Sequence, residues 1–61
     1  MKTEYRGEVW QDGMRVAMAQ GYSYVQVNAE TAHYAAVYVK DGPVLVKLFE
    51  KKPKKRWKQT P

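Results

Sequence analysis

Residues 22–40, YSYVQVNAETAHYAAVYVK, can form either two strands or a helix, and the fold of the whole chain depends on which forms. The aromatic and β-branched residues of 22–28 and 33–40 favour two strands joined by a polar connection. The second segment runs directly into the Asp41-Gly42 pair, which is typical of a tight turn because glycine tolerates a positive φ. We therefore expect two strands here.

The alternative is a helix over about residues 29–40. Asn28 would be its N-cap and Gly42-Pro43 its stop. Three of residues 32–36 are alanine, the best helix former. This alternative gives an α+β fold in which the elements follow the order β-β-β-α-β.

The remaining chain contains further strand signals. The Asp12-Gly13 pair predicts a hairpin between EYRGEVW (4–10) and MRVAMAQ (14–20). The segment VLVKLFE (44–50) is a further strand candidate, and Gly7 indicates a bulge or a close backbone approach. The expected fold is therefore all-β.

Residues 1–50 are expected to form one small β domain, a five-stranded antiparallel meander curled into a small barrel or bent sheet. Residues 51–61 are expected to follow it as a disordered, flexible basic tail, because Pro53 interrupts regular structure and the like charges repel one another.

Two faces of different chemistry are predicted for the strands 22–28 and 33–40. One face is aliphatic and would form the core, with Val25, Val27, Ala35, Val37 and Val39. The other face is aromatic, with Tyr22, Tyr24, Tyr34 and Tyr38. Aromatic rings on a sheet accept unpaired bases by stacking, at about 1–3 kcal/mol each, unless a barrel interior or a partner subunit covers them. Cationic side chains in the body would follow the nucleic-acid backbone, namely Arg6, Arg15, Lys40 and Lys47.

The charge of the chain is concentrated at its C-terminal end. Residues 1–50 carry five basic and six acidic side chains, a net charge of −1, whereas residues 51–61 carry six basic side chains and no acidic one, a net charge of +6. The basic residues of this segment are Lys51, Lys52, Lys54, Lys55, Arg56 and Lys58. Three interpretations are open: an arm that neutralises phosphates, an import address, or a solubilising end. Trp57 favours the first interpretation, because its indole could stack on a base. The alternative for Trp57 is that it packs on the body of the domain.

Several function classes find no support in the sequence. Cysteine is absent and His33 is the only histidine, so we expect neither a metal nor another cofactor. The four glycines are scattered and form no phosphate-binding loop, and no catalytic constellation is present. We expect no enzyme. No apolar run is long enough for a membrane span, and the first ten residues lack the apolar core of a signal peptide. We therefore expect an intracellular protein of the cytoplasm or nucleoid without membrane contact, with a nuclear location as the alternative in a nucleated host.

The sequence favours a small non-enzymatic nucleic-acid-binding protein. It would use an aromatic sheet face and a basic C-terminal arm to bind DNA or RNA through largely electrostatic contacts, with single strands the favoured form. The alternative is a protein-interaction module, a small inhibitor or adaptor that binds a larger protein through a strand edge or the tyrosine face. A 61-residue chain without disulfides has little core, so a homodimer is also expected.

Overall fold

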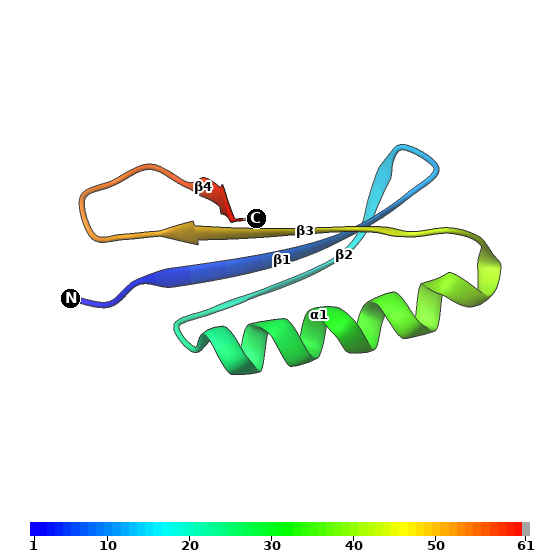
Figure 1. The fold of residues 1–61 in the computed structure, drawn as a ribbon, viewed down its shortest axis with the longest axis horizontal. Coiled ribbons are helices and arrows are strands. Elements are labelled where there is room, and N and C mark those ends of the chain that lie inside the picture. Colours follow the sequence, from blue (N-terminus) through cyan, green and yellow to red (C-terminus); the bar gives the residue numbers. More distant parts are fainter. Residues whose placement is uncertain (61) are drawn as a thin grey trace.

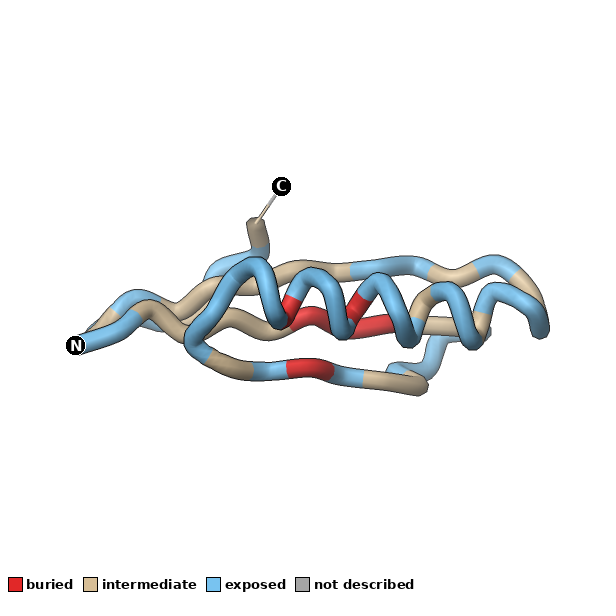
Figure 2. Tube along the Cα trace, turned by 90° about the horizontal axis from the view of Figure 1, so that it is seen from below, coloured by how far each residue is buried: buried red, intermediate tan, exposed pale blue. Residues whose placement is uncertain are grey.

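A computed structural model describes residues 1–60 as one helix packed on one face of an antiparallel sheet (Figure 1). The elements in chain order are β1 (Glu4–Gln11), β2 (Met14–Gly21), α1 (Tyr24–Tyr38), the short 3₁₀ helix η1 (Val39–Asp41), β3 (Leu45–Lys51) and β4 (Lys58–Thr60). The strand order is β2-β1-β3-β4, and each neighbouring pair is antiparallel. The helix α1 lies over β1 and β2 and contacts β3 little, so it covers one side of an open sheet (Figure 2).

The prediction of an all-β, five-stranded barrel or bent sheet is therefore wrong. The α+β alternative fits in class, but two strands precede the helix and two follow it, where the alternative had three and one. Residues 22–28 and 33–40 form no strands, and the helix begins at Tyr24, earlier than the alternative placed it. The cause is Ser23 at the N-cap, whose Oγ accepts a hydrogen bond from the backbone N–H of Gln26 at 3.3 Å. A serine followed three residues later by glutamine is a helix-start signal, and it outweighs the local strand preference of valine and tyrosine.

The helix rests on the sheet through residues spaced three or four apart, which is the spacing of one helical face. Val27 and Thr31 are buried, and Ala35 and Tyr38 are half-buried. At the other end of α1, the amide Nε2 of Gln11 donates to the carbonyl of Tyr38 at 2.8 Å and to that of Gly42 at 3.1 Å. These bonds fix the C-terminal end of α1 to the end of β1.

The first hairpin is confirmed. Strands β1 and β2 pair across Asp12 and Gly13, which have φ angles of 54° and 77°. Two consecutive positive φ values give the turn twist that matches paired strands. The register shifts between Val9 and Trp10, which places a bulge in this pair. By contrast, Asp41-Gly42 closes no hairpin, because it follows a helix and leads into β3.

The prediction of a disordered tail is wrong for the described residues after Glu50. Lys51 is the last residue of β3, and residues 58–60 pair with β3 as β4. The hydroxyl of Thr60 donates to the carbonyl of Leu48 at 3.1 Å. Lys54 adopts a φ of 63° in the connecting turn, and Lys55 N–H donates to the carbonyl of Lys52 at 3.0 Å. The edge of β3 offers free backbone groups, and pairing with them outweighs the mutual repulsion of the lysines.

The core is small and lies where α1 meets β1. Val9, Ala19 and Val27 are the buried hydrophobic residues among residues 1–60, and Thr31 beside them is only 1% exposed. Its hydroxyl donates to the carbonyl of Val27 at 2.7 Å, so no buried polar atom is left unsatisfied at this point. A Cβ added to Gly7 would overlap the Thr31 side chain, lying 2.7 Å from its Cβ. The expected close backbone approach at Gly7 is confirmed.

We predict that Gly7→Ala destabilises the protein by about 1–3 kcal/mol, because a methyl group has no room between β1 and α1. Thermal unfolding followed by circular dichroism measures the change. Gly21→Ala is the matched control, since a Cβ there would meet its nearest neighbour, a Val27 methyl group, at an ordinary 3.5 Å. Equal stability of the two variants would contradict the close packing of α1 against Gly7.

Candidate functional site

The side of the sheet that faces away from α1 carries most of the charged and aromatic side chains of the strands. Gly7 and Val9 point toward α1, so the residues that alternate with them in β1 point away from it. Residues paired across neighbouring strands share a face, so the strand register shows which residues of β2, β3 and β4 also point away from α1. We call this surface the open face. Its aromatic and charged members are Glu4, Arg6, Glu8 and Trp10 of β1, Arg15 of β2, Lys47, Phe49 and Lys51 of β3, and Trp57 immediately before β4.

Glu8 organises the centre of the open face. It is only 6% exposed, and one carboxylate oxygen accepts a hydrogen bond from the indole Nε1 of Trp10 at 2.9 Å. The other oxygen lies 3.1 Å from Nη1 of Arg15 and 3.8 Å from Nη1 of Arg6. A single carboxylate therefore fixes two guanidinium groups and one indole. The two positive charges outnumber the one negative charge, so this cluster is positive overall.

Both tryptophans of the chain lie under cations on this face. The ammonium group of Lys47 lies 4.4 Å from the ring centroid of Trp10, and the guanidinium carbon of Arg6 lies 4.3 Å from that of Trp57. Such contacts are worth about 0.5–1 kcal/mol at exposed sites. Both indoles are half-buried, so part of each ring still meets solvent. The contact of Arg6 with Trp57 also joins the centre of the face to the end of β3.

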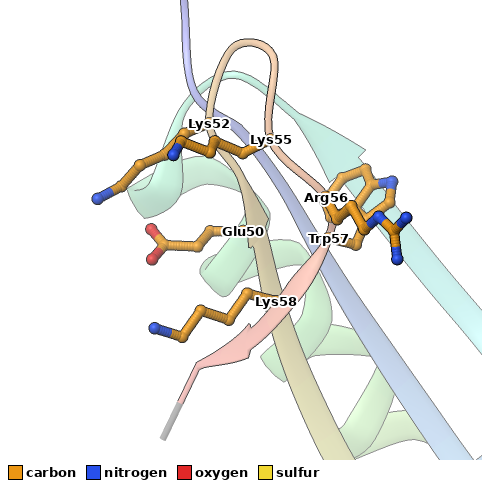
Figure 3. Close-up of a pocket in the computed structure, with 6 residues that line it drawn as sticks. All are labelled: Glu50, Lys52, Lys55, Arg56, Trp57 and Lys58. Atoms are coloured by element: carbon orange, nitrogen blue, oxygen red, sulfur yellow. The ribbon is translucent and has the colours of Figure 1, made fainter.

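The connection between β3 and β4, residues 52–57, forms a basic hairpin at the end of the sheet. A hollow of about 390 Å³ lies here, lined by Glu50, Lys52, Lys55, Arg56, Trp57 and Lys58. Figure 3 shows Glu50, Lys52 and Lys58 projecting to one side of the hairpin, and Arg56 and Trp57 to the other. Four cations and one carboxylate line the hollow, so its potential is positive, which suits an anion such as phosphate.

The structure separates the predicted tyrosine set from the sheet. Tyr22 precedes α1, while Tyr24, Tyr34 and Tyr38 lie on it. Tyr24 meets Tyr5 edge to face, with ring centroids 5.5 Å apart, so it packs against the helix-facing side of β1.

The predicted cationic residues divide in a different way. Lys40 lies in η1, away from the sheet, whereas Arg15 and Lys47 lie on the open face. Lys51 ends β3 on that face, and the remaining basic residues of the C-terminal segment, Lys52, Lys54, Lys55, Arg56 and Lys58, lie in or beside the hairpin with Trp57.

An aromatic sheet face is present, but its rings are not the tyrosines. Trp10 and Phe49 were missing from the predicted set, and only Trp57 belongs to both. The alternation of arginine, glutamate and tryptophan in YRGEVW, residues 5–10, is the sequence signal that places Trp10 with Arg6 and Glu8.

Comparison with known proteins gives no assignment: no protein-family model matches the chain, and neither a curated protein nor a solved structure is similar to it. Across residues 1–60, no cluster of three or more histidine, aspartate or glutamate side chains is arranged to hold a metal ion. Over the same residues, α1 is neither long enough nor apolar enough to cross a membrane.

We predict that Glu8→Ala lowers the free energy of unfolding by about 1–3 kcal/mol, because it removes the charged acceptor of Trp10 and Arg15. Urea unfolding measures the loss. Glu30→Ala, which removes the same charge from an exposed position on α1, is the control and should change stability by less than about 0.5 kcal/mol. If both substitutions have the same effect, Glu8 does not organise the face.

Proposed function

We propose that the protein binds nucleic acid, with single strands as the preferred form, through the open face and the basic hairpin. The observation that carries this proposal is the interleaving of aromatic and cationic side chains on one uncovered sheet face. Trp10, Phe49 and Trp57 alternate there with cations, and the contact of Arg6 with Trp57 makes the face continuous with the hairpin. Bases stack on aromatic rings while phosphates meet the cations.

The distribution of charge supports a phosphate backbone as the ligand. The open face holds Arg6, Arg15, Lys47 and Lys51 against Glu4 and Glu8, and the hairpin adds further cations beside the single carboxylate of Glu50. Neutralising phosphates with lysine and arginine releases condensed counterions, which favours binding and makes it dependent on salt. The sheet therefore offers stacking surface and electrostatic attraction on the same side.

The side chains of α1 argue against a function in which this helix enters the groove of a duplex and contacts its bases. Within residues 24–38 the only charged side chain is Glu30, which a phosphate backbone would repel. Helices that enter the major groove carry side chains that donate to bases and phosphates. A sheet face with partly exposed rings suits unpaired bases better, because each base has a π face to stack.

Trp10→Leu is predicted to weaken binding of a short single-stranded oligonucleotide by about 1–3 kcal/mol, because leucine keeps an apolar side chain but cannot stack. Fluorescence anisotropy of a labelled oligonucleotide at low and moderate salt measures the affinity. Tyr34→Leu on α1 is the matched control and should bind like the unsubstituted protein, with circular dichroism confirming that both variants fold.

Two results would contradict the proposal. If Tyr34→Leu weakened binding as much as Trp10→Leu, the open face would not be the binding surface. If the unsubstituted protein bound no oligonucleotide even at low salt, a nucleic-acid function would be excluded and a protein partner would become the leading candidate.

A further inference from the structure

The outer side of α1 carries an exposed stripe of small apolar residues. Val25, Ala29, Ala32, Ala36 and Val39 are all exposed, with Val25 at 77% and Val39, directly after the helix, at 52%. Their spacing is four, three, four and three residues, which places them on one line along the helix. We call these five residues the outer stripe.

The outer stripe is unusual for a helix side that meets water. Surface helices place charged and polar residues opposite their buried side, whereas a helix that is apolar all round is normally covered. The inner side of α1 is already apolar at Val27, and Glu30 is the only charged residue between positions 24 and 38. Gln26, Asn28 and His33 are the other exposed polar residues, so α1 has an inner and an outer apolar side in addition to its polar positions, as a helix that packs on two sides has.

The surface area of the chain points the same way. Its accessible surface is 4619 Å², about 500 Å² more than a compact protein of 7.1 kDa exposes by the usual scaling with mass. The radius of gyration is 11.9 Å, against about 10.5 Å for a compact chain of this length. A standard stable interface buries about 800 Å² on each partner, which is of the same order as this excess, so an interface with a second chain would bring the exposed area down to that of a compact protein.

We propose that the outer stripe pairs with the outer stripe of a second copy of the chain, to form an antiparallel helix-to-helix dimer. The alternating spacing of four and three residues is that of helices that pack along a shared seam. The three central alanines have side chains small enough for the two helices to approach closely. A seam that contacts itself about a two-fold axis is also the commonest arrangement of homodimers.

The position of the basic hairpin sets the antiparallel direction. The hairpin lies at the same end of the molecule as the start of α1 (Figure 1). Parallel helices would bring two hairpins together, each with cations from Lys52 to Lys58, and their repulsion would oppose association. Antiparallel helices place the hairpins at opposite ends of the dimer. The central residue of the stripe, Ala32, then meets its own counterpart.

This dimer is independent of nucleic-acid binding, because α1 and the open face lie on opposite sides of the sheet. Pairing through the outer stripe leaves both open faces uncovered. A protein that dimerises but binds no oligonucleotide would contradict the proposed function alone, and a monomer that binds would contradict the dimer alone.

Analytical ultracentrifugation at high micromolar concentration tests the pairing. The unsubstituted chain should sediment as a species of twice 7.1 kDa. Ala32→Glu places a charge at the centre of the seam and should give a monomer. Val37→Glu adds the same charge to an exposed position of α1 outside the stripe and should remain a dimer. A monomeric unsubstituted chain, or a dimer that Ala32→Glu leaves intact, would overturn the proposal.

A single introduced cysteine tests the direction, since the chain has no cysteine of its own. With a short thiol crosslinker, Ala32→Cys should give a covalent dimer. Val25→Cys should not, because antiparallel helices place the two introduced thiols about 20 Å apart. Equal crosslinking of both variants would indicate parallel helices and overturn the antiparallel arrangement. Failure of both would exclude the seam.

Discussion

The close approach of α1 to β1 at Gly7 and Thr31 is the constraint on which the other features of the structure depend. Glycine at this position of the central strand leaves room for a threonine side chain, and the threonine satisfies its own hydroxyl within the helix. The helix therefore lies low on β1 and β2, and the buried core between them needs only Val9, Ala19 and Val27 among the apolar residues that the structure describes. A bulkier residue at either position would lift α1 and expose this core.

The position of α1 on one face of the sheet also gives the sheet two sides of different chemistry. At the core, the side toward α1 carries Gly7, Val9 and Ala19, whereas the opposite side of the same strands carries tryptophan, phenylalanine and most of the charged side chains. Glu8 prevents the cations on that side from simply repelling one another, because Arg6 and Arg15 share its carboxylate. The arrangement keeps the tryptophan rings in place and leaves a net positive surface.

Some parts of the structure could be predicted from local signals, whereas the face on which the aromatic residues meet depends on strand pairing and could not. The Asp12-Gly13 pair was enough to predict the first hairpin. The residue pattern of 44–50 was enough to predict a strand there, which the structure has at Leu45–Lys51. The helix was predicted only as the alternative, and with a later start, because valine and tyrosine favour strands, although Ser23 and Gln26 mark its start. The predicted site named tyrosines, whereas the rings of the open face belong to tryptophan and phenylalanine, because the register of β1 with β3, and not any local motif, brings these residues to one face.

A titration followed by two-dimensional ¹H–¹⁵N NMR tests most directly whether nucleic acid binds to the side of the sheet opposite α1. The indole N–H groups of Trp10 and Trp57 give two separate side-chain signals, because the chain contains only these two tryptophans. With a short single-stranded oligonucleotide, both indole signals and the backbone amides of β1 and β3 should shift, while the amides of residues 24–38 stay in place. Shifts confined to α1, with both indole signals unmoved, would contradict the account.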